Sequence, residues 1–261
     1  MNKRIAHTGL SLMLAVVMSF SLILPKMGFA KDTQYNPKVS FVFSDTAISE
    51  SGTGDGYEIE NTALTITKSG TYAVSGSCAN GSITVKKGVK DVNLVLDGLT
   101  LSADDTAPIS IHKSSAVNLI IKENTDNYLS DTEKNNDEIT AGAENAVIKC
   151  KDGTQVVISG SGSLEIKANG KNGIKSGAST EEDGNASLVI KEVHLTIDAP
   201  VNDAINAESD LTVPSGTLQL SAGDDAIHSD TNLIVGAADA TDAPSIQIDS
   251  CYEGFEGANI K

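Results

Sequence analysis

Short runs of apolar and polar residues, separated by Gly, Asn, Asp and Ser, extend along the chain from Tyr57 onward. Apolar, β-branched runs of this length with turn residues on both sides are typical of β-strands. The clearest expected strands are 64–66, 83–85, 92–96, 117–121, 156–158, 188–190, 211–213 and 233–235. After Ala30 no stretch keeps a helical period for three turns. The pattern therefore predicts a protein that is nearly all β.

One five-residue pattern recurs four times: an acid or amide, a small residue, a large apolar residue, a polar residue and another small residue. The copies begin at Asn172, Asp203, Asp225 and Glu253, and each follows a strand-like apolar pair. The second, small position therefore recurs at residues 173, 204, 226 and 254. Self-similarity of this kind indicates one supersecondary unit stacked on itself.

The number of strands in each repeat separates the possible all-β architectures. The shortest repeat holds three strand-like pieces, so a coil of about 22 or more residues matches a parallel β-helix, with loops at the corners of longer coils. A propeller blade would need four strands in a longer unit, and a sandwich would not keep identical columns. One inward apolar column is expected to contain Leu164, Leu195, Leu218 and Ile246. The outward ladder beside it is expected to contain Glu165, Thr196, Gln219 and Gln247.

The two ends of the chain suggest its organisation. Residues 1–30 are typical of a secretory signal peptide, because Lys3 and Arg4 precede an apolar run and small residues flank a cleavage position after Ala30. A membrane anchor is less favoured, since the apolar run is short for a span. We expect a lead-in segment over 31–56 and one β-helix domain over 57–261. Because the chain ends at Lys261 in what resembles the start of another strand, without a polar cap, we predict a truncated C-terminus.

Charge narrows the classes of partner. Cleavage after Ala30 would remove three basic residues and no acid, so the net charge would change from −16 to −19. It would also remove Arg4, the only arginine, and with it any bidentate guanidinium contact. Such a secreted protein would repel nucleic acid and anionic membranes and favour divalent cations or neutral partners.

Several segments resemble those of a known family. The first half contributes GTYAVSG at 70–76, GSITV at 81–85, VNLVLDGLTL at 92–101 and NTDNYL at 124–129. The second half contributes NGIKS at 172–176, DAI at 225–227 and YEGFEG at 252–257. Together they resemble the bacterial carbohydrate-binding β-helix family, which is known for binding cellulose and pectin.

This resemblance covers the chain from about Tyr57 to its end. It implies a right-handed, single-stranded parallel β-helix similar to polysaccharide lyases. It also implies binding of acidic plant polysaccharide such as polygalacturonate, with bound calcium and without established catalysis. The chain departs from the family pattern at Ala204 and Ala226, where the family has Gly, so these corners are expected to avoid a positive φ angle. The family's C-terminal coils are expected to be missing.

The acidic corners are the candidate metal site. Asp203, Asp225 and Glu253 should stack on consecutive coils about 5 Å apart. Two unit charges at that separation repel by roughly 1 kcal/mol in water and by about 3–4 kcal/mol near a protein surface. A calcium ion that took several oxygen ligands would remove this repulsion, and the neighbouring candidate ligands are Asn202, Asp224 and Glu256. The alternative is a solvated acidic ladder whose side chains splay apart.

An acidic protein without arginine cannot hold a polyanion by direct attraction, so we expect calcium to bridge protein and uronate carboxylates. Trp is absent, and Tyr252, just outside the corner, is the best candidate for stacking on a sugar ring. Phe255 belongs to the inward column and is expected in the core. We therefore predict a secreted, calcium-associated, non-catalytic protein whose partner is plant cell-wall polysaccharide.

Two other functions stay open. A calcium-dependent pectate-type lyase would need a base, and Lys175, beside the acidic corner, is the one plausible lysine. The histidines His112, His194 and His228 are isolated in the sequence. For His228 a surface position is favoured over one near the carboxylates. A purely structural spacer or adhesin module is the other alternative, since β-helices also serve as rigid spacers.

Overall fold

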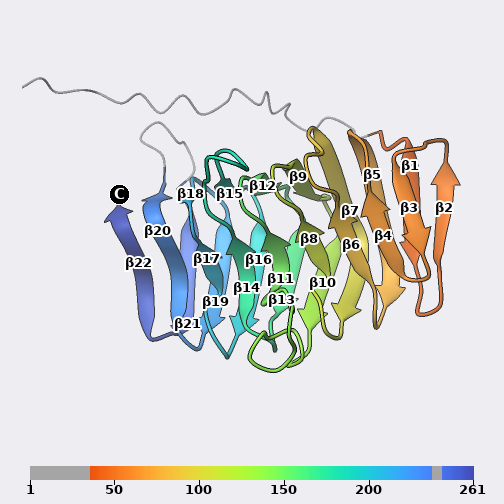
Figure 1. Cartoon of the computed structure of the whole chain (residues 1–261). Helices are drawn as coiled ribbons and strands as arrows, with labels where there is room; N and C mark the ends of the chain where they lie inside the picture. Colours follow the sequence, from red (N-terminus) through yellow and green to blue (C-terminus); the bar gives the residue numbers. More distant parts are fainter. Residues whose placement is uncertain (1–35, 237–242) are drawn as a thin grey trace, which may run out of the picture. The chain divides into compact units, whose positions relative to one another are not determined.

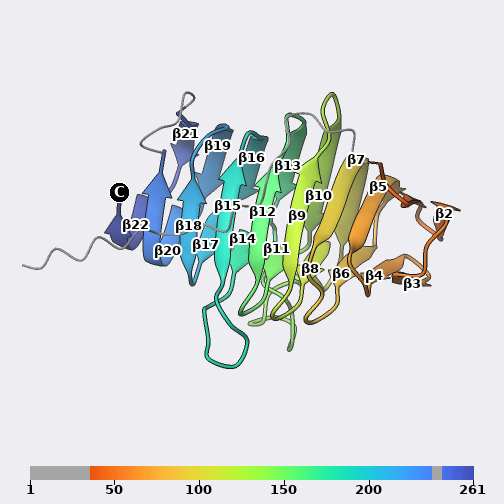
Figure 2. The ribbon, with the colours of Figure 1, turned by 90° about the horizontal axis from the view of Figure 1, so that it is seen from above.

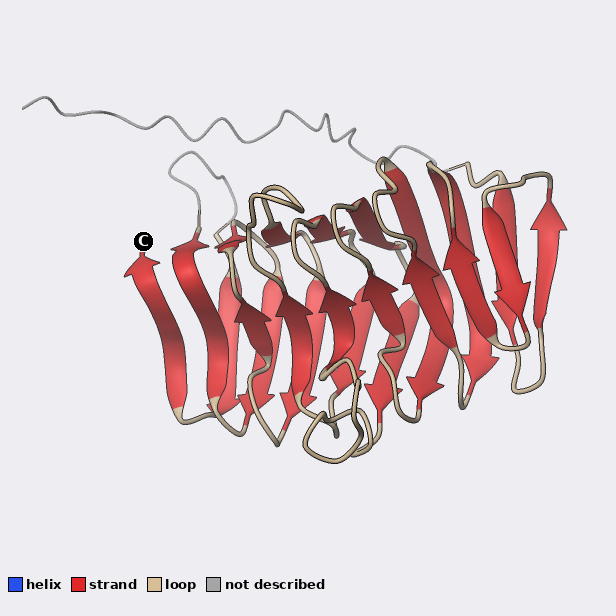
Figure 3. Cartoon of the chain, viewed as in Figure 1, coloured by secondary structure: helices blue, strands red, loops and turns tan. Residues whose placement is uncertain are grey.

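The computed structural model describes residues 36–236 and 243–261, and these residues form strands joined by loops and turns (Figure 1, Figure 3). This confirms the all-β prediction. The signal peptide predicted for residues 1–30 lies outside the described residues. Within the described ranges there is no helix long and apolar enough to cross a membrane.

The described residues belong to one compact unit, and two antiparallel hairpins lie at its N-terminal end. They are formed by β1 (Val39–Phe43) with β2 (Ile48–Gly52), and by β3 (Tyr57–Glu60) with β4 (Ala63–Ile66). β1 then pairs in parallel with β5 (Gly70–Cys78). The predicted lead-in segment therefore supplies two strands to the unit, and one of them begins a parallel ladder.

The later strands form three parallel ladders, and we call one passage of the chain through them a coil. The first ladder runs through β5, β7 (Val92–Ala103), β9 (Ala116–Ile121), β12 (Gln155–Ser159), β15 (Ser187–Lys191), β18 (Asp210–Val213) and β20 (Asp225–Val235). The second runs through β5, β7, β10 (Asp126–Asp131), β13 (Ser163–Lys167), β16 (His194–Ala199), β19 (Thr217–Ala222) and β21 (Ser245–Ser250). The third runs through β4, β6 (Ser82–Val85), β8 (Ile109–Ile111), β11 (Ala146–Cys150), β14 (Asn172–Ser176), β17 (Ile205–Ala207), β20 and β22 (Glu253–Ile260).

The connectivity is regular. Each strand from β8 to β17 pairs in parallel with the strand three places further along the chain. Seen from above, the strands of successive coils therefore follow one another along the unit (Figure 2). The arrangement is a solenoid-like, mostly parallel sheet in which a position in one coil lies beside the same position in the next.

The registers place the predicted columns as expected. Leu164 pairs with Leu195, Leu195 with Leu218, and Leu218 with Ile246, and the three leucines are buried. The outward ladder of Glu165, Thr196, Gln219 and Gln247 follows in the same registers. Alternation between buried and exposed positions thus builds one continuous apolar core inside the coils.

The third ladder has its own core column, and its last residue differs from the prediction. Ile174, Ile205 and Ile227 are fully buried, and Phe255 is next to Ile227 in register. Phe255 is nevertheless 41% exposed, so its expected place in the core was wrong. The reason is that, among the described strands, β22 pairs only with β20.

At the first of the four corners, the small residue is needed for space rather than for backbone conformation. Neither Ala204 nor Ala226 has a positive φ angle, which confirms the prediction, and Gly173 does not have one either. A Cβ atom on Gly173 would lie 2.5 Å from the Ala204 carbonyl oxygen and 2.5 Å from Ile197 Cγ2. At Gly173 the corner therefore excludes even a Cβ atom, because consecutive coils approach closely there.

Candidate functional site

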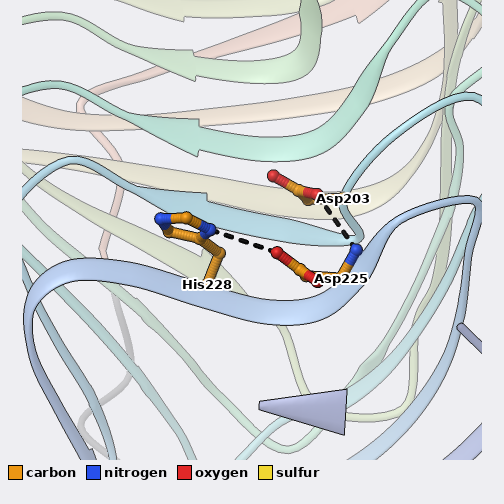
Figure 4. A group of neighbouring side chains, drawn as sticks. All are labelled: Asp203, Asp225 and His228. Carbon is orange, nitrogen blue, oxygen red and sulfur yellow. Dashed lines mark hydrogen bonds and ion pairs between the residues drawn. The ribbon is translucent and has the colours of Figure 1, made fainter. Parts of the chain in front are cut away.

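The repeat places the acids at or just before the start of strands in the third ladder, on consecutive coils. Asp225 is in register with Glu253, and its backbone N–H donates a hydrogen bond of 3.1 Å to Asp203 Oδ1 (Figure 4). The predicted stack of Asp203, Asp225 and Glu253 is therefore present. It arises because the parallel register brings equivalent positions of neighbouring coils together.

Burial distinguishes the members of this stack. Asp203 is 3% exposed and Asp225 is 4% exposed, whereas Glu253 is exposed. Asp203 also accepts a hydrogen bond from the side-chain amide of Asn206. The two inner carboxylates are therefore not a solvated ladder, and their charges must be balanced within the protein.

His228 joins the carboxylates, an arrangement that the sequence left as the less favoured alternative to a surface position. Its Nδ1 lies 3.2 Å from Asp225 Oδ2 (Figure 4) and 2.8 Å from Glu256 Oε2, and its Nε2 lies 2.7 Å from Asp230 Oδ1. The signal was available in the repeat, because the residue three places after each acid forms an outward row. His228 and Glu256 occupy that position on adjacent coils.

The side chains form two groups whose ligand atoms lie within 4.8 Å of one another. Asp203, Asp225 and His228 make up the first, and Asp225, Glu253 and Glu256 make up the second. Asp225 is common to both. The second group offers carboxylate oxygens alone, which suits hard cations such as calcium, whereas an imidazole suits zinc and other transition metals.

The pKa values show how the cluster is balanced without a metal. Burial, a hydrogen bond shared with Glu256 and the charges of Asp203 and Asp224 raise the pKa of Asp225 to about 6, against the opposing effect of His228. Burial opposes charge on His228, but hydrogen bonds to Asp230 and Asp225 and the nearby carboxylates raise its pKa overall. Protons bound to Asp225 and His228 therefore neutralise part of the negative charge of the cluster, and a bound cation would displace them.

Two of the predicted ligands, Asp224 and Asn202, form hydrogen bonds between neighbouring corners. Asp224 is exposed and belongs to neither group, and its carbonyl accepts a 2.7 Å hydrogen bond from the Tyr252 N–H. The Asn202 amide donates to Asn172 Oδ1 at 2.8 Å. These residues therefore hold neighbouring corners together, and Asp224 also contributes charge near Asp225.

Lys175 and Tyr252, the other two candidates, have different surroundings. Lys175 Nζ lies 2.9 Å from Glu208 Oε1, so it is engaged in an ion pair. Tyr252 is 81% exposed and directly precedes Glu253 in the chain. An exposed aromatic ring beside a carboxylate group is suited to contact with a large ligand.

Comparison with known proteins adds three findings. The profile of a family described as "Carbohydrate-binding domain-containing protein" matches residues 60–256. A carbohydrate-binding domain-containing protein from Acetivibrio thermocellus is 34% identical over 122 residues, which are 46% of this chain and 42% of that protein. The chain thus matches less than half of that relative's length. A polysaccharide lyase-like protein from C. thermocellum, solved as a gadolinium derivative, superposes with a TM-score of 0.67 at 23% identity, over 86% of this chain and 97% of that one. At this low identity, the similarity to the polysaccharide lyase-like protein shows a common fold and nothing further.

Proposed function

Because the chain belongs to the family of carbohydrate-binding domain-containing proteins, we propose that it binds acidic plant polysaccharide, above all polygalacturonate, through bound calcium and without catalysis. Cellulose is the second glycan that we include in this proposal. The observation that carries it is the cluster of Asp225, Glu253 and Glu256, whose carboxylate oxygens lie within 4.8 Å of one another on consecutive coils. In the proposed complex, this cluster binds the cation, and the cation binds the polyanion.

The donor chemistry of the cluster supports calcium. Calcium takes six to eight oxygen ligands in flexible geometry, so carboxylates from two coils suit it, with water and ligand oxygens in the remaining positions. Asp203 would add charge from a third coil, because it contacts the Asp225 backbone. Asp224 and Asn202 would act from the neighbouring corner. His228 would lose its proton or turn away when the cation enters.

The charge of the protein supports a bridging role for this cation. The whole chain carries a net charge of −16 at pH 7. A polyuronate would be repelled by such a surface unless a cation lay between the two. In the proposed complex, calcium binds protein carboxylates on one side and uronate carboxylates on the other, and the exposed ring of Tyr252 stacks on a sugar.

Retention on immobilised polygalacturonate tests this function directly. The protein is expected to bind in the presence of calcium and to elute in excess chelator, and Asp225→Asn is expected to bind weakly in both conditions. Glu165→Gln is a matched control, because it removes one outward carboxylate from the second ladder. Retention that persists in excess chelator would contradict calcium bridging. Failure to bind any plant polysaccharide would favour the structural spacer.

Two further parts of the proposal concern architecture and location. We propose that the three ladders form a right-handed, single-stranded parallel β-helix. The recurrence of parallel pairing at every third strand from β8 to β17 supports it. We also propose secretion to the extracellular space or cell surface after cleavage behind Ala30. N-terminal sequencing of the mature protein tests the latter.

A calcium-dependent polysaccharide lyase is the second candidate function, favoured by the lyase-like protein among the similar folds. Its predicted base, Lys175, forms an ion pair with Glu208 at 2.9 Å, so its amine already has a partner and is not free to accept a proton from a substrate. Ultraviolet absorbance of unsaturated product on polygalacturonate with calcium would reveal this activity. The proposed binding function expects no such product.

A further inference from the structure

Lys149 on β11 is a half-buried lysine that forms no ion pair with the described residues. In the part of the chain that the structure describes, no hydrogen bond or ion pair ends on its ammonium group. Its neighbours differ in this respect. Lys151 Nζ lies 2.7 Å from Glu144 Oε1, and Lys175 has the ion pair with Glu208. Two nearby carboxylates are therefore already engaged by other lysines.

The surroundings of Lys149 penalise its positive charge. Burial and the adjacent charge of Lys175 lower the pKa of Lys149, and the charges of Glu208 and Glu144 compensate only in part. A half-buried cation without a partner costs free energy that an external anion would recover. On the preceding coil, Ser110 Oγ is buried without a hydrogen-bond partner. An ammonium group without an ion pair and a buried hydroxyl without a partner are thus adjacent in register.

The position of Lys149 links it to the carboxylate cluster. The registers of the third ladder give one outward row across six coils, formed by Ser110, Lys149, Lys175, Asn206, His228 and Glu256. Lys149 and Lys175 are adjacent in it, and His228 is three coils beyond Lys149. At the spacing of paired strands this separation is about 14 Å. One end of the row is therefore basic and the other is acidic.

We propose that Lys149, with Lys175 beside it, binds a uronate carboxylate directly, as a metal-independent subsite for the same acidic polysaccharide that the calcium cluster holds. This inference rests on the proposed function. A polyuronate laid across the strands along this row has one carboxylate at the lysines and a later one at the cation bound by Asp225, Glu253 and Glu256. The two subsites act differently, since calcium overcomes the repulsion at the acidic end and the free ammonium fixes the chain at the basic end.

Substitution of Lys149 tests the subsite. Lys149→Met keeps an unbranched stem and removes the charge, and Lys122→Met is the matched control, because it removes the same charge from a lysine paired with Asp97. In saturating calcium, Lys149→Met is expected to bind polygalacturonate about tenfold or more weakly than the wild type, as loss of a charged hydrogen bond predicts. Lys122→Met is expected to bind as the wild type does. Equal affinity of the two variants would overturn the subsite.

The outcomes separate this inference from the function on which it rests. If the wild type does not bind polygalacturonate in calcium, the proposed function fails. If it binds and Lys149→Met binds equally well, the lysine subsite alone fails. Fully methyl-esterified polygalacturonate, which lacks the carboxylate charge, is expected to bind the wild type and Lys149→Met equally weakly. A difference between the two proteins on this neutral polymer would contradict carboxylate recognition.

Amine labelling of the wild-type protein provides a measurement that does not depend on a variant folding. Lys149 is expected to be acetylated more slowly when polygalacturonate and calcium are present than when neutral dextran replaces the polymer. Lys122 is expected to be labelled equally in both samples. Peptide mass mapping quantifies both sites, and unchanged labelling of Lys149 in the presence of bound polymer would overturn the proposal.

Discussion

His228 Nδ1 lies 2.8 Å from Glu256 Oε2, so the last two strands of the third ladder, β20 and β22, are joined by an ion pair when the imidazole is protonated. The same nitrogen lies 3.2 Å from the buried carboxylate of Asp225. One imidazole thus compensates acids from two coils. Removing its proton leaves those acids to repel each other unless a cation replaces it.

The first prediction is a loss of stability as the pH rises. The pKa of Asp225 is raised to about 6 in the folded protein, from 3.8, and the pKa of His228 is raised above 6.5. For both groups the folded state binds more protons than the unfolded state, so their contribution is present at low pH and is lost as the pH rises through the folded pKa values. In chelator, unfolding should become easier between pH 5 and pH 8, by on the order of 1 kcal/mol.

This prediction needs a comparison of two proteins, because the pH dependence of the wild type alone combines the titration of several groups. Burial lowers the pKa of His112 in the folded protein. The contribution of His112 to the stability of the fold therefore increases as the pH rises, opposite to the contributions of Asp225 and His228. The informative quantity is therefore the difference between the wild type and Asp225→Asn in thermal unfolding at each pH. The unfolding midpoint of the wild type is expected to exceed that of Asp225→Asn by more at pH 5 than at pH 8. A pH-independent difference would contradict the linkage.

The second prediction concerns calcium. When calcium is added at pH 7.5 to protein that has been freed of metal with a chelator, the unfolding midpoint is expected to rise. A ligand at 100 times its Kd stabilises the folded state by about 2.7 kcal/mol. Asp225→Asn and Glu256→Gln are expected to lose this increase, since each removes a carboxylate from the oxygen-only group. Glu165→Gln is expected to retain it. An equal increase in all four proteins would place the calcium elsewhere.

Much of the fold was predictable because a solenoid-like arrangement turns sequence intervals into spatial neighbours. The register that pairs Leu164 with Leu195, and Asp225 with Glu253, follows directly from the repeat. The stacking of the acids was therefore visible in the sequence. Their burial was not, because it depends on the side chains and loops that cover each corner, and these differ from coil to coil.

The features that the sequence did not reveal depend on longer-range contacts. Asp183 belongs to a loop between β14 and β15 that was expected only as a corner insertion. Its carboxylate is buried and lies 2.9 Å from Lys113 Nζ and 3.2 Å from Lys87 Nζ. The three residues come from different coils, so no local pattern connects them. Lys149 was missed for a related reason, since the absence of a partner is apparent only when neighbouring coils are in place.

The third prediction compares two positions of one core column. Ile174→Ala removes a fully buried side chain that is enclosed by coils on both sides, and it is expected to cost about 2–5 kcal/mol. Phe255→Ala, at the exposed end of the same column, is expected to cost clearly less despite its larger side chain. Denaturant unfolding measures both. A larger loss for Phe255→Ala would mean that the end of the column is more tightly packed than its 41% exposure indicates.

The last prediction concerns Tyr252, which is 81% exposed and is joined to the acidic corner through the hydrogen bond from its N–H to the Asp224 carbonyl. Because so little of the ring is buried, Tyr252→Ala should leave thermal unfolding unchanged. If the ring stacks on a sugar, the substitution should weaken binding to polygalacturonate roughly two- to tenfold, as expected for an aromatic contact of about 0.5–1.5 kcal/mol. Tyr252→Phe keeps the ring and should bind as the wild type does. Tyr128→Ala, on the second ladder, is the positional control, and binding of Tyr252→Ala at wild-type affinity would remove Tyr252 from the site while leaving the carboxylate cluster untouched.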